Sequence, residues 1–330
     1  MNRARARVFY GNLAPLGFGG CLGGCSRIQS ALSPQGVEAE RIGVLFWGTT
    51  ILLAIVLLAT ATVAIVAASG NARVRGLIAT ERFVVGAGLA FPVICLSALL
   101  AWSVSVMAER PAGGDSPIRI RVIGEQWWWR VIYRLPDGTE FESANELRIP
   151  VGQPVPLTLE TADVIHSFWV PNLAGKIDMI PGRKNALTLH ATAAGISRGQ
   201  CAEYCGGPHA WMAFHVVALD ADAFARWLED ERGPAPAAGA TGHETFVRIG
   251  CGACHRVRGL PGADGRIGPD LTHVAGRLSI GAGRLGSDAA AIASWITGNQ
   301  HLKPANRMPA YRILETDELA ALAGFVAGLR

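Results

Sequence analysis

Two long stretches without charged residues mark the first third of the chain, at residues 42–68 and 83–108. At a rise of about 1.5 Å per residue, each is long enough to cross a hydrocarbon core of about 30 Å. The connection between them carries three arginines against one acid, Glu81, and such a basic loop favours the cytoplasmic side of a membrane. The pattern therefore predicts a two-helix transmembrane hairpin over residues 42–110, with everything that follows on the outer side.

Beyond the second span the pattern changes to a period of two. Ile118, Ile120 and Val122 alternate with arginines, and Pro-Asp-Gly at residues 136–138 marks a turn. Short strand patterns separated by Gly and Pro continue to about residue 220. This alternation predicts a β-sandwich in a domain of residues 111–230.

A third domain is predicted after a linker rich in Pro and Ala at residues 231–240. A short helical pattern at residues 223–230 precedes the linker, and its composition indicates a semi-rigid spacer. Residues 241–330 contain helical patterns on both sides of a cysteine motif. We expect an all-α domain there.

The beginning of the chain resembles a bacterial lipoprotein signal. Residues 1–24 hold three arginines near the start and a weakly apolar, glycine-rich run that ends Leu22-Gly23-Gly24-Cys25. This pattern predicts cleavage before Cys25, lipidation of its thiol, and an N-terminal periplasmic segment at residues 25–41. The alternative is an uncleaved tail in which Cys21 and Cys25 have no role.

Composition and charge narrow the class of protein. Half of the residues are apolar, which favours a membrane protein, and the net charge is +4. Residues 1–110 hold nine bases and four acids, residues 111–232 eleven bases and fifteen acids, and residues 233–330 ten bases and seven acids. The distribution excludes a polybasic nucleic-acid binder. It predicts that the basic last domain docks electrostatically on the acidic middle one, so that transfer between them slows at high salt.

A candidate metal loop lies near the end of the middle domain. Cys201, Cys205, His209 and Met212 supply soft sulfur and imidazole donors, the set that selects copper over hard cations. Two cysteines allow two thiolates to bridge two metal ions, and His166 is the candidate for a further ligand. The alternative is a structural disulfide between the two cysteines.

The last domain contains the c-type haem attachment motif. In Cys251-Gly-Ala-Cys254-His255 the two thiols form thioethers with the haem and the imidazole binds the iron. Met308, followed by Pro309 as in class I cytochromes c, is the candidate for the sixth iron ligand. A thioether opposite His favours electron transfer over oxygen binding. A zinc pair or a redox dithiol is the alternative, and neither requires the adjacent His or the distant Met.

The copper loop, together with His166 in a His-Ser-Phe segment, resembles subunit II of the haem-copper cytochrome c oxidases. The resemblance implies a cupredoxin-type Greek-key sandwich that holds CuA, a centre of two copper ions. Its implied ligands are the bridging thiolates Cys201 and Cys205, the imidazoles His166 and His209, the weak axial thioether Met212 and the backbone carbonyl of Glu203. It also implies that the Glu203 side chain reaches a Mg ion shared with subunit I.

Two further segments carry the resemblance. Residues 126–129, Gln-Trp-Trp-Trp, resemble the aromatic patch above CuA, which implies that Trp127 admits electrons. An interfacial aromatic belt near the membrane is the alternative interpretation. Residues 176–183 resemble the segment that faces subunit I, where Asp178 and Arg183 would join a polar network between CuA and the haem.

Taken together, the chain resembles a subunit II with a fused cytochrome c, as in caa-type oxidases. This implies transfer of electrons from cytochrome c or the fused haem c through CuA to haem a in subunit I, where a proton-pumping oxidase reduces oxygen to water. The implied partners are subunit I, subunit III, membrane lipid and a soluble or membrane-bound cytochrome c or the bc complex as donor. The implied location is the bacterial inner membrane, as a multi-pass lipoprotein with its redox domains on the periplasmic face.

Three other classes account for less of the sequence. Quinol oxidases have a similar second subunit without the copper ligands. Another reductase with CuA, such as nitric or nitrous oxide reductase, is an alternative, but the latter is expected to have a large His-rich copper domain and no membrane hairpin. A copper storage protein or chaperone leaves the hairpin, the Trp patch and the haem motif without a role.

Overall fold

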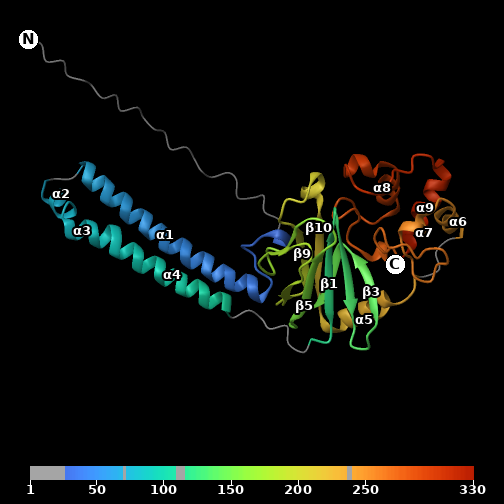
Figure 1. Ribbon diagram of the computed structural model, residues 1–330, viewed down its shortest axis with the longest axis horizontal. Coiled ribbons are helices and arrows are strands. Elements are labelled where there is room, and N and C mark those ends of the chain that lie inside the picture. Colours follow the sequence, from blue (N-terminus) through green and yellow to red (C-terminus); the bar gives the residue numbers. More distant parts are fainter. Residues whose placement is uncertain (1–26, 70–71, 109–115, 236–239) are drawn as a thin grey trace, which may run out of the picture.

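The computed structural model describes residues 27–69, 72–108, 116–235 and 240–330. The predicted signal segment and Cys25 lie outside these residues. In the chain order of Figure 1, a pair of long helices is followed by a two-sheet sandwich and then by a helical domain, which lies at the end of the sandwich away from the helix pair. The three predicted types of structure therefore all occur.

The helix pair consists of α1 (Val37–Ser69) and a second rod built from α3 (Glu81–Val85), a π-helical turn at Gly86–Ala90 and α4 (Phe91–Ala108). The short helix α2 (Ala72–Ile78) connects them. Both rods are long and apolar enough to cross a membrane, and their apolar side chains are exposed. The π turn ends two residues before Pro92, which cannot donate a backbone hydrogen bond to the preceding turn.

The sandwich contains two five-stranded sheets of order β3-β2-β1-β5-β8 and β4-β10-β9-β6-β7. Parallel pairing of β1 with β5 and of β4 with β10 joins segments that are distant in sequence. The strands are β1 (Arg119–Glu125), β2 (Trp128–Arg134), β3 (Glu140–Ala144), β4 (Glu146–Pro150), β5 (Val155–Thr161), β6 (His166–Trp169), β7 (Ile177–Met179), β8 (Asn185–Leu189), β9 (Gly195–Cys201) and β10 (Ala213–Leu219).

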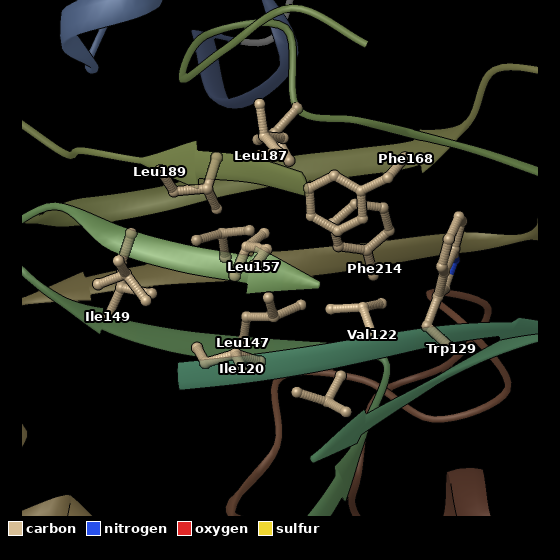
Figure 2. Packing of buried hydrophobic residues seen from close by; sticks show 14 of the residues in the cluster. Ile120, Val122, Trp129, Leu147, Ile149, Leu157, Phe168, Leu187, Leu189 and Phe214 are labelled. Carbon is tan, nitrogen blue, oxygen red and sulfur yellow. The ribbon is translucent and has the colours of Figure 1, made fainter. Parts of the chain in front are cut away.

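Alternate residues of the strands form the core between the sheets. Ile120 and Val122 of β1 face Leu147, Phe168 and other apolar side chains, all buried, as Figure 2 shows. Such burial contributes about 1.5–3 kcal/mol per large side chain. The rigid core fixes the strand ends, and the metal loop begins and ends on two of them.

The helical domain follows α5 (Ala221–Arg232), which is longer at both ends than the predicted helix at residues 223–230. Gly233 and Pro234 follow it, and proline cannot continue a helix. The domain comprises α6 (Ala240–Arg248), α7 (Cys251–Cys254), a short 3-10 turn (Val274–Gly276), α8 (Ala289–Leu302) and α9 (Thr316–Gly328). Its separate core includes Phe246, Leu322 and Phe325.

The helical domain contacts the sandwich directly. Charged side chains of the sandwich form hydrogen bonds with the backbone of the helical domain. Arg130 Nη2 donates to the Arg266 carbonyl at 2.9 Å, and Arg148 Nη2 donates to the Gly276 carbonyl at 2.6 Å. Glu146 Oε2 accepts from the Leu278 N–H at 2.7 Å. These bonds hold the helical domain against the sandwich.

Candidate copper and haem sites

Strand pairing brings the predicted copper ligands together. Cys201 is the last residue of β9 and Met212 directly precedes β10, and the Cys201 N–H donates to the Met212 carbonyl at 2.9 Å. His166 begins β6, which pairs with β9 through Phe168 and Cys201. His209 lies in the 3-10 helix between the two ends of the loop.

The five side chains form one compact cluster. The Sγ atoms of Cys201 and Cys205 lie 3.7 Å apart, and both cysteines are free and buried. Each is adjacent to one imidazole: Cys201 Sγ is 3.8 Å from His166 Nδ1, and Cys205 Sγ is 3.6 Å from His209 Nδ1. Met212 Sδ lies 3.8 Å from Cys205 Sγ. This is a donor set of two thiols, two imidazoles and a thioether.

The remaining predicted ligand is the Glu203 carbonyl, which lies 3.1 Å from Cys201 Sγ. The Glu203 side chain turns back to its own loop and accepts from the Tyr204 N–H at 3.2 Å. Within the residues that the structure describes, His166, Cys201 and Cys205 form the group of His, Cys, Asp or Glu side chains close enough to share a metal. A magnesium site at Glu203 stays a prediction.

The charges of the two thiols depend on each other. The interaction with Cys205, and then the hydrogen bond with His166, lower the pKa of Cys201, although burial opposes this. The same interaction and burial raise the pKa of Cys205. Two adjacent thiolates therefore require positive charge between them, which soft metal ions supply. The donor set fits copper.

Asp163 is a functional candidate that the sequence analysis missed. Its Oδ1 lies 2.8 Å from His166 Nε2, so the other ring nitrogen, Nδ1, faces Cys201. Burial alone would lower the pKa of His166, but hydrogen bonds to Cys201 and Asp163 raise it. Metal-bound imidazoles commonly have such a carboxylate partner. An acidic residue three positions before a ligand His is the signal that would have identified it.

Trp127 lies directly against the copper loop. Its Nε1 donates to the Cys205 carbonyl at 2.9 Å. Gly206 has a φ of 116°, and a Cβ there would lie 3.0 Å from Trp127 Cζ2, so glycine allows the ring to approach the loop. The resemblance implies a Trp on the open surface above CuA. Here Trp127 is half-buried and lines a pocket whose wall also contains residues of the helical domain.

Asp178 and Arg183 do not join the cluster. Asp178 is in β7, opposite Ser167, and its Oδ1 lies 3.6 Å from Lys176 Nζ. Arg183 is exposed in the following turn. Both are on the segment that is predicted to face subunit I, and their roles stay predictions.

The predicted haem ligands line one pocket of the helical domain. Cys251, Cys254, His255 and Met308 all contribute to its wall. His255 Nδ1 donates to the Pro269 carbonyl at 2.8 Å, which leaves Nε2 for an iron ion. Burial lowers the pKa of His255 and so favours the neutral, ligating form.

Two further observations test whether haem fits the pocket. A Cβ at Gly268 would lie 2.4 Å from His255 Cε1, so glycine is needed for the ring to stand in this position. Arg277 also lines the pocket, and its buried Nε has no hydrogen-bond partner. A carboxylate of a bound haem would satisfy this donor. The residues present fit a covalently attached haem.

The wall of the haem pocket also contains residues of the sandwich. Trp127 and Trp128 line it together with the helical domain. Trp127 therefore lies between the copper ligand loop and the haem pocket. Pattern analysis of either domain alone gives no signal for this arrangement.

Comparisons with known proteins identify the family of each of the two domains. Residues 134–219 match the family described as cytochrome c oxidase subunit II, periplasmic domain, and residues 239–330 match cytochrome c. Cytochrome c oxidase subunit 2 of Alkalihalophilus pseudofirmus is 36% identical over 67% of this chain and 64% of its own length. The protein of the same name from a Bacillus species (strain PS3) is 31% identical over 73% of this chain and 70% of its own.

A solved structure gives a local match. The periplasmic domain of subunit II of cytochrome oxidase of Bradyrhizobium japonicum is 33% identical, and the match covers 37% of this chain and 97% of that domain with a TM-score of 0.33. The chain spans 64% to 70% of the length of these two relatives. The shared identity over that length, with a copper-type ligand cluster and a haem motif in consecutive domains, means that the chain belongs to the subunit II family of cytochrome c oxidases.

Proposed function

We propose that the chain is the electron-accepting subunit of a membrane-bound haem-copper oxidase. It receives electrons from a cytochrome c or from its own haem c domain and passes them through a binuclear copper site to haem a in subunit I. Trp127 carries the proposal, because it lines the haem pocket and also donates a hydrogen bond to the carbonyl of the copper ligand Cys205. A single side chain thus contacts both redox sites.

The residues of the copper cluster are suited to holding a two-metal centre. Cys201, Cys205, His166 and His209 would hold the copper, with Met212 and the Glu203 carbonyl as further ligands. Bound copper would supply a one-electron carrier whose charge is shared between two ions. The rigid strand ends hold the ligands in nearly one arrangement, which keeps the structural change on electron transfer small.

The residues of the haem pocket are suited to holding a second electron carrier. Cys251 and Cys254 would attach the haem, and His255 and Met308 would bind its iron. A haem with this ligand pair supplies a second one-electron carrier of relatively high potential. Linking two redox domains in one chain replaces a bimolecular encounter by an intramolecular one, at an effective concentration on the order of mM.

The membrane helices supply the location. We infer that α1 and the α3–α4 rod cross a bacterial inner membrane, that their arginine-rich connection is cytoplasmic, and that both redox domains are periplasmic. Subunit I, subunit III and an external cytochrome c or bc complex are the proposed partners. A copper storage protein or chaperone has no need of a Trp shared between a copper cluster and a haem pocket.

Electron paramagnetic resonance of the full-length chain, purified from membranes with haem attached and copper added, tests this function. We expect a multi-line copper pattern from one electron shared by two nuclei, together with a low-spin haem signal. Photoreduction of the haem should then be followed by reduction of the copper. A single-copper spectrum, or no copper signal from folded and fully loaded protein, would overturn the proposal.

A further inference from the structure

Lys303 has an unusual position at the contact between the two redox domains. It follows α8 and is 2% exposed. Its Nζ crosses the interface to donate to the Trp127 carbonyl at 2.5 Å, and it also donates to the Gly281 carbonyl of its own domain at 3.2 Å. Buried lysines are normally paired with acids. Lys303 instead bonds to two backbone carbonyls, one from each domain.

The segment that begins with Lys303 also carries the predicted iron ligand Met308. Asn306 Nδ2 donates to the Lys303 carbonyl at 2.8 Å, and Asn306 Oδ1 accepts from the Met308 N–H at 3.0 Å. Gln300 Nε2 donates to the Met308 carbonyl at 2.8 Å. These bonds tie the segment from Lys303 to Met308 to the end of α8, so the position of Lys303 and that of Met308 are linked.

The other partner of Lys303 is linked to the copper loop in the same way. Trp127, whose carbonyl accepts from Lys303, donates through its ring to the Cys205 carbonyl. A continuous set of hydrogen bonds therefore runs from the Met308 segment through Lys303 and Trp127 to Cys205. Because it joins side chains and backbone of both domains, it constrains their relative position.

We propose that Lys303 is a positioning residue for electron transfer between the two domains. It holds the Trp127 backbone against the haem domain, so that the ring which contacts the copper loop stays in the wall of the haem pocket. The proposal rests on the proposed function of the two sites. It adds a specific residue that keeps the copper site and the haem site in a fixed relative position.

The energetics of the site support a functional role for this side chain. Burial and the nearby Arg284 lower the pKa of Lys303 to about 7, against the opposing effect of the Cys205 charge. A buried ammonium without an acid partner costs stability, and an apolar side chain of similar length would avoid that cost. The bond to Trp127 gives the lysine a role that an apolar residue cannot fill.

The test compares Lys303→Met with Lys303→Arg in the full-length chain loaded with haem and copper. After photoreduction of the haem, the rate of copper reduction is measured, and hydrogen exchange reports on the backbone around Trp127 and Gly281. Loss of a hydrogen bond to a charged group shifts an equilibrium by about tenfold or more. In Lys303→Met we expect electron transfer from haem to copper to be about tenfold slower. Backbone amide hydrogens should exchange faster around both Trp127 and Gly281, and the spectra of both cofactors should be unchanged.

Lys303→Arg restores a long cationic donor and should recover most of the rate. The matched control is Lys184→Met, which removes an exposed lysine of the sandwich that pairs with Glu160. If Lys303→Met does not fold, Lys303→Gln takes its place, because its shorter side chain is polar but does not reach the Trp127 carbonyl.

Three outcomes contradict the proposal. Transfer in the Met or Gln variant at the wild-type rate would overturn it, as would a loss of rate in proportion to lost haem or copper, which indicates a merely structural role. Failure of Lys303→Arg to recover the rate would also count against it. Absence of transfer in the wild-type chain would instead overturn the proposed function, so the two failures are distinguishable.

Discussion

The two redox sites are assembled in different ways. The copper cluster lies within one domain, where the ladder between β9 and β10 and the pairing of β6 with β9 bring each ligand side chain within 3.8 Å of at least one other. The haem pocket is lined by two domains, and its wall includes Trp127 and Trp128 of the sandwich. The first site depends on strand register and the second on how the domains dock.

This difference means that the sites should respond differently to mutation. A change in the copper loop should act on copper and leave the haem spectrum intact. A change at the domain contact should lower the rate of electron transfer between the two sites and leave each metal bound.

Replacing Cys201 by Ser should abolish the two-copper signal, because one of the two thiolates that would hold the copper is lost. The low-spin haem signal should persist, since no haem ligand belongs to the sandwich. Copper content and electron paramagnetic resonance of the purified full-length chain measure both. Cys95→Ser, which alters a free cysteine of α4, is the matched control and should leave both signals unchanged. Loss of the haem signal in Cys201→Ser would mean that the haem site depends on the copper loop.

Replacing Asp163 by Asn should weaken copper binding by about 10- to 100-fold, as expected when the partner of a metal-bound imidazole is lost. The asparagine amide has nearly the same shape as the Asp163 carboxylate, but it lacks the negative charge that lies against the His166 ring. Competition with a copper chelator measures the change, and Asp222→Asn, an exposed position in α5, serves as the control. Unchanged affinity would mean that strand geometry alone sets the orientation of His166.

Sequence patterns predicted most of the architecture because each element carries its own signal. The uncharged spans, the period of two and the two cysteine motifs are local, and the helix pair, the sandwich and the helical domain all appear in the structure. All five side chains predicted to bind copper lie together, as their spacing and the resemblance implied.

The contact between the domains was predicted only in outline. Charge totals indicated electrostatic docking, and an ion pair, Arg307 with Asp163 at 3.7 Å, does join the domains. Most of the interfacial charges, however, bond to backbone: Arg130, Arg148 and Lys303 each donate to a carbonyl across the contact. A carbonyl has no signature in the sequence, so the bond from Lys303 to the Trp127 carbonyl is not visible from composition or periodicity.

The smallest predicted effect concerns pH and His215, a residue of β10 at the domain contact. Its Nδ1 lies 3.3 Å from Ser279 Oγ of the haem domain. Burial lowers the pKa of His215, Glu146 in β4 opposes this, and Arg198 in β9 lowers the pKa further. The unfolded chain therefore binds a proton more readily than the folded one near the ordinary histidine pKa of about 6.5.

The sign of the effect follows from this difference in proton binding. The stabilising contribution of neutral His215 should be fully present above about pH 6.5 and lost as the pH falls below it. The free energy of unfolding, followed by haem absorbance in denaturant, should decrease less on acidification in His215→Gln than in the wild type. His301→Gln, an exposed position in α8, should match the wild type. Parallel curves for all three chains would mean that protonation of His215 does not weaken the domain contact, and that bonds between charged side chains and backbone maintain it across this pH range.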